Sequence, residues 1–231
     1  PGGEGALLAL GKVGGGGMSA SGDLDLILVY DHAQDAARSD GERPLAPSQY
    51  FVRLTQRLVA ALSAATAEGT LYEVDFRLRP SGNAGPLATS LSSFARYQTE
   101  SAWTWEHMAL TRARILAGDP QLSERLSAVI REALCRPREA DALRADVSAM
   151  RERIRREKGS DDHFHLKTVA GGLIDVEFLA QYGQLLAAPD EPDVLATATA
   201  DQLANAGRLG VFPAGVTEKL TKALSLYQPL S

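Results

Sequence analysis

The segment Leu71–Arg79 alternates between apolar and charged side chains. Successive side chains of a β-strand point to opposite faces, so this period predicts a strand with one buried face and one charged face. The Pro-Ser-Gly that follows is expected to end it, because proline and glycine interrupt strands. The expected apolar face comprises Tyr72, Val74, Phe76 and Leu78, and the expected charged face comprises Glu73, Asp75, Arg77 and Arg79.

A second strand is expected over Asp23–Tyr30, where aspartates alternate with apolar residues. Asp23 and Asp25 then share one face, and Leu24 points the other way. If the two strands are neighbours in one sheet, Asp75 lies beside the aspartate pair. Three adjacent carboxylates repel one another, so either protonation or a cation must relieve the repulsion. The blander alternative is that these aspartates are solvated strand ends.

The three carboxylates predict a metal site. Hard oxygen ligands with room left for water and phosphate are typical of Mg²⁺. Two such ions about 4 Å apart bind the attacking and leaving oxygens of a phosphoryl displacement. Asp23, Asp25 and Asp75 are therefore the candidate catalytic and metal-binding residues, and Mg²⁺ is the candidate cofactor.

The glycine-rich stretch before Asp23 predicts a phosphate-binding turn. Backbone N–H groups approach a triphosphate closely where no Cβ intervenes, which makes Gly14 and Gly15 candidate contacts. No Gly-Lys-Ser/Thr follows, so this is not a Walker loop, and a flexible linker is the alternative. Arg77 and Arg79 are candidates to hold phosphate oxygens, with a structural salt network as the alternative.

The chain divides into a part with strand signals and a part with helical signals. A helix is expected over Ser48–Ala67, between the two strands. After Leu91 helical periodicity dominates, over residues 91–116, 119–135, 139–157, 173–187, 194–206 and 213–228. We therefore expect an α+β fold: a catalytic domain over residues 1–118, with a small mixed sheet flanked by helices, and then an all-α helical bundle domain over residues 119–231. The bundle is expected to belong to a longer protein.

The acidic balance of the chain limits its partners. A net charge of −5 and a pI near 5.4 argue against nucleic-acid binding, which needs a basic surface. A bound metal ion can still supply local positive charge for a nucleotide. No apolar run reaches the length of a membrane span, so no membrane partner is expected. The single cysteine, Cys135, fits a reducing compartment, and a cytoplasmic protein is expected.

Several segments resemble the glutamine synthetase adenylyltransferase family, which belongs to the DNA polymerase β-like nucleotidyltransferase superfamily. The matching segments are Gly11–Gly15, Asp23–Ile27, Leu71–Gly82, Ala102–Arg114 and Gly171–Phe178. The Trp-Thr-Trp-Glu-His run in the fourth segment is very specific. Together with the Pro-Ser-Gly after Arg79, it resembles the C-terminal, AMP-attaching half of the family's bifunctional enzyme. The matches span most of residues 11–185.

The resemblance implies a polymerase β-like fold and transfer of AMP from ATP to a tyrosine hydroxyl of glutamine synthetase, with release of pyrophosphate. It implies that Asp23 and Asp25 bind two magnesium ions. Asp75 is then expected to complete the site and to accept the hydroxyl proton. The resemblance also implies that glutamine and PII signal proteins regulate the full-length protein.

The glycine segment carries part of the same resemblance. Gly14, Gly15 and Ser21 are expected to cradle the β- and γ-phosphates of ATP. The chain departs from the family here in two ways. Glycines occupy positions 16 and 17, where the family usually has a polar or charged residue, and Ser21 precedes a glycine, which reverses the usual Gly-Ser order.

Other chemistry-bearing residues are expected to be structural. Trp103 and Trp105 are expected to pack, with docking of adenine or of the target protein as the alternative. The run Arg151–Lys158 predicts a solvated helix face, with contact to an acidic partner as the alternative. Asp175 and Glu177 lie two residues apart on an expected helix, so they point to different sides and cannot easily share one ligand.

Two other functions fit the same residues. The same fold serves phosphorolytic removal of AMP from modified glutamine synthetase. The second alternative is a regulatory module that binds nucleotide or glutamine and catalyses no reaction. The intact acids at positions 23, 25 and 75 count against this alternative. Labelling of unmodified glutamine synthetase from radioactive ATP distinguishes the forward enzyme from both.

Overall fold

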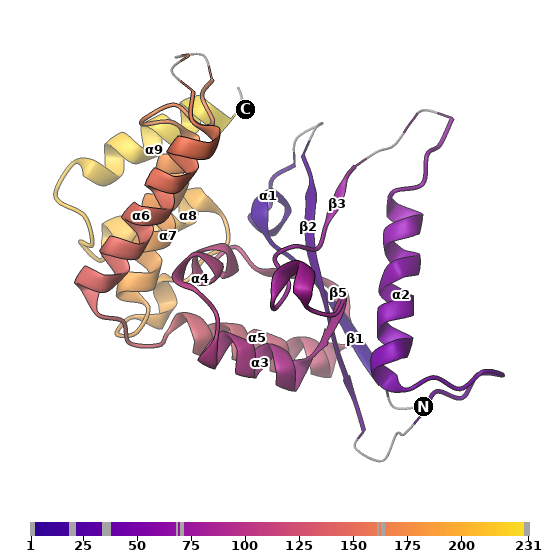
Figure 1. The fold of residues 1–231 in the computed structure, drawn as a ribbon. Helices are drawn as coiled ribbons and strands as arrows, with labels where there is room; N and C mark the ends of the chain where they lie inside the picture. The colour runs from indigo at the N-terminus through magenta and orange to yellow at the C-terminus, as the bar shows by residue number, and fades with distance from the viewer. Residues whose placement is uncertain are drawn as a thin grey trace. The chain divides into compact units, whose positions relative to one another are not determined.

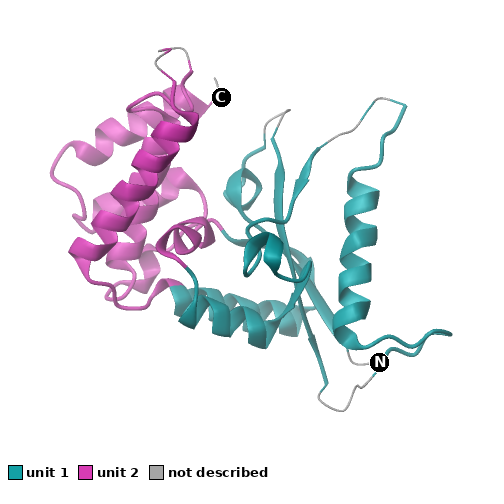
Figure 2. Cartoon of the chain, in the orientation of Figure 1, with its two compact units in different colours: residues 1–102, 113–133 teal, residues 103–112, 134–231 magenta. Residues whose placement is uncertain are grey.

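The computed structural model describes residues 3–18, 22–33, 38–67, 69, 72–160, 162 and 165–228. The chain forms two compact units (Figure 2). Unit 1 comprises residues 1–102 and 113–133, and unit 2 comprises residues 103–112 and 134–231. Unit 1 contains the described strands, and the described part of unit 2 is helical (Figure 1). The expected α+β class, with a small mixed sheet and helices, is confirmed.

The sheet of unit 1 is mixed. Strands β1 (Gly3–Ala9) and β2 (Leu24–His32) pair antiparallel, and β5 (Arg114–Gly118) pairs antiparallel with the other edge of β1. The short strands β3 (Val74–Asp75) and β4 (Ala88–Ser90) both pair parallel with β2. The order is β3-β2-β1-β5, with β4 also beside β2. This topology places the start of β2 next to β3.

Helices cover both sides of the sheet, which buries β2. Helix α2 (Pro47–Leu62) lies along one side, and α3 (Leu91–Glu100) and α5 (Pro120–Leu134) lie on the other (Figure 1). Tyr30 of β2 stacks on Phe51 of α2, with ring centroids 4.3 Å apart. The buried cluster on the α2 side comprises Ala9, Val13, Leu26, Leu28, Tyr30, Phe51, Phe76 and Ala88. This apolar contact fixes β2, and with it the position of the aspartates at its start.

Strand β3 is much shorter than the strand predicted to run as far as Arg79. The chain turns directly after Asp75, because the Arg77 main-chain N–H donates to the Asp75 side chain instead of continuing the ladder. A further turn follows, with the Arg79 N–H donating to the Phe76 carbonyl at 3.2 Å. Arg79 is therefore not on the charged face of a strand and is buried.

The helix predicted over residues 91–116 is three separate elements. Helix α3 ends at Glu100, α4 (Thr104–Leu110) begins four residues later, and β5 follows. The break is stabilised locally, because the Glu106 carboxylate accepts a hydrogen bond from the Trp103 main-chain N–H at 2.9 Å. This contact is a cap that starts a new helix.

Strand β1 arises where the glycine-rich composition of residues 1–22 gives no strand signal. Its glycines lie against an aromatic ring: a Cβ added at Gly3 or Gly5 would lie 3.3 or 3.5 Å from the ring of Phe51. Hydrogen bonding to β2 and β5 on its two edges supplies the stability that its own residues lack. Tertiary pairing thus outweighs intrinsic strand propensity here.

Unit 2 is a bundle of helices around its own apolar core. Besides α4 it contains α6 (Ala140–Lys158), α7 (Leu173–Ala187), α8 (Thr199–Arg208) and α9 (Val216–Tyr227). Its core cluster comprises Leu173, Val176, Ala180, Leu203 and Leu224. Helix α4 packs against α6 and α7, whereas β5 and α5 stay with the sheet. The compact units therefore differ from the single junction expected near residues 118–120. No described helix is long and apolar enough to cross a membrane.

Candidate active site

The ladder between β2 and β3 brings two of the predicted site residues side by side. Asp25 pairs with Asp75 in this parallel register, and Leu24 pairs with Val74. The Leu24 N–H donates to the Glu73 carbonyl at 2.8 Å, which fixes the register. Neighbouring strands lie about 4.8 Å apart, and paired residues project to the same face. The two carboxylates therefore leave the sheet together.

Asp23 lies one residue before β2, at the mouth of a cleft within unit 1. The volume of this cleft, about 560 Å³, is in the range of small-molecule sites. Asp75 also lines it, and Asp25 is half-buried beside this residue. The described lining residues are Asp23, Gln56, Val59, Glu73, Val74, Asp75, Phe76, Arg77, Arg79, Asn83 and Leu87.

Arg77 is the cation that offsets this acidic group. Its main-chain N–H donates to Asp75 Oδ1 and its Nε donates to Oδ2, both at 2.7 Å. The hydrogen bond to Asp75 and the charge of Asp75 raise the pKa of Arg77, and the charges of Asp23 and Asp25 add to the increase. All three candidate carboxylates therefore act on one guanidinium group, whose side chain is 70% exposed.

Asp75 is ionised at neutral pH. Burial by itself raises the pKa of this carboxyl, but the hydrogen bonds from Arg77 and the charges of Arg77 and Arg79 outweigh that effect. The pKa of Asp75 therefore lies below its usual value. A carboxylate in this state can act as a cation ligand or as a proton acceptor.

The donor set fits a hard divalent cation, although the carboxylates are not in ligand geometry. No group of three acidic, histidine or cysteine side chains within the described ranges is arranged to hold one metal ion. In this structure both oxygens of Asp75 accept hydrogen bonds from Arg77. The donors are nevertheless all carboxylate oxygens, two in cross-strand register and a third just upstream, which is the chemistry that Mg²⁺ prefers. The Arg77 guanidinium supplies the positive charge that such an ion would bring.

Gly11 is a site residue that the sequence reasoning missed. Its φ is +57°, and a Cβ added there would lie 2.1 Å from Asp25 Oδ2. The Leu10 N–H, just before it, donates to the Asp25 carbonyl at 3.0 Å. A residue with a side chain at position 11 would displace the Asp25 carboxylate. The only sequence signal is that Gly11 begins the Gly-Lys-Val-Gly-Gly run.

The backbone N–H groups of the glycine turn donate to carbonyls of the same turn. Helix α1 (Gly11–Gly14) is a single short turn after β1. The N–H of Gly14 donates to the carbonyl four residues earlier at 2.8 Å, and the N–H of Gly15 does the same at 3.2 Å. The two N–H groups expected to contact phosphate are therefore used within the turn. Ser21, the third predicted phosphate contact, lies outside the described residues.

Arg79 organises the loop between β3 and β4. The exposed fraction of this residue is 8%, and its guanidinium donates to main-chain carbonyls at 2.7 to 3.4 Å. The accepting residues are Phe76, Gly85 and Pro86. The loop includes Ser81, which has a positive φ of 61°. Of the two arginines predicted to bind phosphate, only Arg77 has an exposed side chain.

Two acidic residues of α7 form ion pairs within unit 2. Asp175 pairs with Arg151 of α6 and accepts a hydrogen bond from the Gly171 N–H at 2.6 Å. Glu177 pairs with Arg112 at 2.7 Å. The two acids have different partners on different elements, so the prediction that they point to different sides is confirmed. These pairs tie α6 and the turn that follows α4 to α7.

The exposed residues of unit 2 differ in how well they match the predictions. The expectation that both tryptophans pack is wrong for Trp103, which is 69% exposed, whereas Trp105 is 37% exposed. The run Arg151–Lys158 forms a largely solvated face of α6 with pairs one turn apart, such as Arg153 with Glu157 at 2.9 Å. The solvated-face prediction is therefore confirmed for most of this run.

Known protein families match both parts of the chain. The family model of glutamate-ammonia ligase adenylyltransferase matches residues 3–129, which is more than half of the sequence. This chain belongs to that family. The family model of GlnD PII-uridylyltransferase matches residues 123–230, a range that covers most of unit 2. The resemblance to the adenylyltransferase family drawn from the short motifs is therefore confirmed.

Relatives within the glutamate-ammonia ligase adenylyltransferase family share about half of the residues. A bifunctional glutamine synthetase adenylyltransferase/adenylyl-removing enzyme of Rhodopseudomonas palustris strain BisB5 is 51% identical over 226 residues. Proteins of the same name from Bradyrhizobium diazoefficiens and Xanthobacter autotrophicus are 50% and 52% identical over 228 and 227 residues. These matches cover 98 to 99% of this chain but only 23% of each relative. The chain therefore corresponds to one part of a much longer family member.

Proposed function

We propose that this chain transfers AMP from ATP to a tyrosine hydroxyl of glutamine synthetase and releases pyrophosphate. The observation that carries the proposal is the cross-strand pairing of Asp25 with Asp75 beside a cleft that Asp23 also lines. The name of the relatives, glutamine synthetase adenylyltransferase/adenylyl-removing enzyme, supports this chemistry. We assign the chain to the AMP-attaching, C-terminal half because Ala102–Arg114 and the Pro-Ser-Gly after Arg79 resemble that half.

The three aspartates are assigned to the reacting groups. Asp23, Asp25 and Asp75 would hold Mg²⁺, which supplies positive charge to stabilise the triphosphate and to lower the pKa of the attacking hydroxyl. A phenol has a pKa of about 10, so a proton acceptor is needed at neutral pH. Asp75 is ionised there and serves as that acceptor. The hydroxyl oxygen attacks the α-phosphorus, and the bond from this phosphorus to the pyrophosphate oxygen breaks.

Arg77 is assigned to the phosphates of ATP. Its side chain is 70% exposed and lines the cleft, and a guanidinium group binds phosphate oxygens in pairs. When the Arg77 guanidinium turns from Asp75 to an incoming phosphate, Asp75 Oδ2 becomes free, whereas Oδ1 keeps its hydrogen bond from the Arg77 main-chain N–H. Arg79 is assigned to stabilising the loop between β3 and β4. Gly14 and Gly15 are assigned to shaping the turn, and Ser21 is kept as a candidate phosphate contact.

Regulation is assigned to the full-length protein. We propose that glutamine and PII signal proteins regulate the full-length protein, as the family resemblance implies. The direction of the reaction is a separate question, because the relatives' name includes both attachment and removal of AMP.

The test of the function uses ATP labelled with radioactive phosphorus in the α-phosphate, Mg²⁺ and unmodified glutamine synthetase. The proposal expects label on a tyrosine of glutamine synthetase, identified in a proteolytic peptide. A removing enzyme leaves this substrate unlabelled and releases AMP groups from modified glutamine synthetase when phosphate is added. No labelling, together with such release, would reject the proposed direction.

Gly11→Ala is expected to reduce AMP transfer strongly, because an added Cβ would lie 2.1 Å from Asp25 Oδ2 and displace it. Misplacement of a reacting group by about 1 Å costs on the order of 100-fold in rate. The matched control is Gly16→Ala, which also has a positive φ, +83°, but has nothing within 4 Å of the added Cβ. Initial transfer rates of the two variants are compared with the unmodified chain. Equal losses in both would show that backbone strain, and not the contact with Asp25, is responsible.

A further inference from the structure

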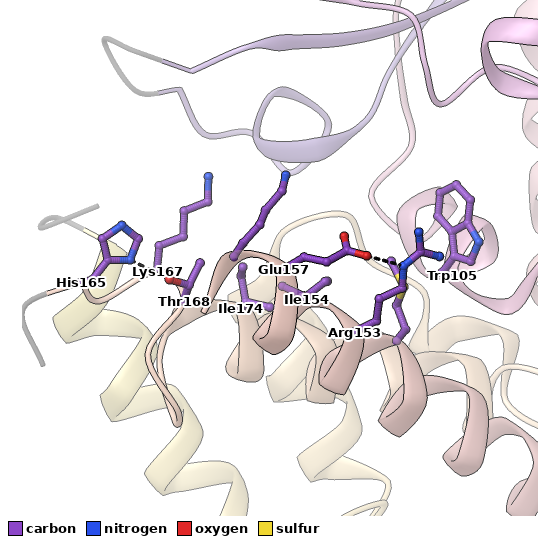
Figure 3. A pocket seen from close by; sticks show the side chains of 10 residues that line it. Trp105, Arg153, Ile154, Glu157, His165, Lys167, Thr168 and Ile174 are labelled. Carbon is purple, nitrogen blue, oxygen red and sulfur yellow. Dashed lines mark hydrogen bonds and ion pairs between the residues drawn. The ribbon is translucent and has the colours of Figure 1, made fainter. Parts of the chain in front are cut away.

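Unit 2 contains a pocket that the proposed reaction does not use (Figure 3). Its volume is about 670 Å³, and it lies between α4, α6, the start of α7 and the segment that precedes α7. The lining residues are Trp105, Met150, Arg153, Ile154, Glu157, Lys158, His165, Lys167, Thr168 and Ile174. All of them belong to unit 2, so the pocket is a property of this unit alone.

One part of the pocket carries positive charge that no described carboxylate pairs with. Lys158 and Lys167, the second of which is labelled in Figure 3, both line the pocket, and neither forms an ion pair or a side-chain hydrogen bond with a described residue. The lining carboxylate, Glu157, is already bound to Arg153 at 2.9 Å. Two ammonium groups that line one pocket repel each other, and a bound polyanion would relieve that repulsion.

A hydrogen bond orders the side of the pocket next to Lys167. His165 Nδ1 and Thr168 Oγ1 are 2.6 Å apart, and Thr168 is buried. The imidazole is therefore held in place on the rim (Figure 3). The pocket thus offers one hydrogen-bonded imidazole and two ammonium groups, which together suit several phosphate oxygens.

The other part of the pocket is apolar and ends at an aromatic ring. Ile154 and Ile174 lie between Lys167 and Trp105 (Figure 3), and Met150 also lines the pocket. Trp105 is 37% exposed, so part of its indole is open to a ligand. Aromatic side chains stack with nucleobases of every kind, because each base has a π-face.

We infer that this pocket binds a nucleoside polyphosphate, with the phosphates at Lys158 and Lys167 and the base directed to Trp105. The combination decides the ligand class. A purely inorganic polyanion would leave the apolar part unused, and an apolar molecule would leave both ammonium groups unpaired. The inference is independent of the carboxylates at positions 23, 25 and 75, which belong to unit 1.

The test is a fluorescence titration that measures the emission of Trp105. The chain has two tryptophans, so Trp103→Phe leaves Trp105 as the reporter. The titrations use ATP, inorganic tripolyphosphate and adenosine, each in EDTA. Asp23→Asn and Asp75→Asn are added to the background, so that failure of the proposed reaction does not affect the result. The test variant is Lys158→Ala with Lys167→Ala, and the matched control is Lys219→Ala with Lys222→Ala on α9, outside the lining.

We expect ATP to change Trp105 emission with a lower Kd than tripolyphosphate, and adenosine to bind much more weakly than either. Loss of two charge-assisted contacts should raise the ATP Kd by about tenfold or more in the test variant, and the control should keep the original Kd. The inference is overturned if the test variant retains the original ATP Kd or if the control weakens binding equally. It is also overturned if tripolyphosphate binds as tightly as ATP.

Discussion

Replacement of Asp75 by asparagine lowers the rate of AMP transfer to glutamine synthetase by a factor of about 10²–10⁴, the range for loss of a positioned proton acceptor. Asparagine keeps the size of the side chain and one oxygen that can accept from Arg77, so β3 and its turn are expected to remain folded. It removes the charge, and with it both the proposed cation ligand and the proposed base. The measurement is the initial rate of label transfer from ATP.

The matched control for this prediction is Glu124→Gln, which makes the same chemical change at an exposed position of α5 outside the cleft. It is expected to keep the original transfer rate, because surface changes away from a site have small effects. If Asp75→Asn transferred AMP as fast as Glu124→Gln, the assignment of Asp75 would be wrong.

Glu177→Ala lowers the free energy of unfolding of unit 2 by about 2–4 kcal/mol, because removal of one partner from a largely buried ion pair leaves the other charge uncompensated. Its partner Arg112 has a side chain that is 9% exposed, and the Nε of this residue has no hydrogen-bond partner among the described residues. The Glu177 side chain is 21% exposed, so water replaces only part of the lost contact. Urea denaturation followed by far-ultraviolet circular dichroism measures the change.

An exposed pair in the same unit supplies the control. Glu218 and Lys222 are 2.7 Å apart on α9, with side chains that are 69% and 75% exposed. Glu218→Ala is expected to change the free energy of unfolding by less than about 1 kcal/mol, since solvent screens such pairs. Equal effects of Glu177→Ala and Glu218→Ala would contradict the structural role given to the Arg112 pair.

The part of the fold that could be predicted rests on local periodicity. The aspartates that alternate with leucines over Asp23–Leu26, and the apolar run that continues to Tyr30, identified β2, because apolar residues of a strand must meet a core. Strands β1 and β5 could not be found this way, since their stability comes from pairing with distant segments. The predicted helix over residues 91–116 failed for a related reason. Helical periodicity does not reveal a short break where a carboxylate caps a new helix, as Glu106 does.

The candidate site was predictable to the extent that strand geometry determines it. Because side chains alternate along a strand, Asp23 and Asp25 could be predicted to share one face. The adjacency of β2 and β3 accounts for the pairing of Asp25 with Asp75. The contacts of Arg79 were not predictable, because they depend on how the loop after β3 folds back on this side chain. The need for glycine at position 11 depends in the same way on a contact with Asp25 that only the folded chain reveals.

The most direct test of the account is Mn²⁺ binding, followed by electron paramagnetic resonance in the presence of ATP, with Mn²⁺ as the spectroscopic substitute for Mg²⁺. We expect Asp25→Asn and Asp75→Asn each to weaken Mn²⁺ binding by about tenfold or more, because each removes one of few carboxylate ligands from a shared site. Glu124→Gln is expected to leave binding unchanged. Mn²⁺ binding that is as tight in both aspartate variants as in the unmodified chain would contradict the claim that β2 and β3 together hold the cation.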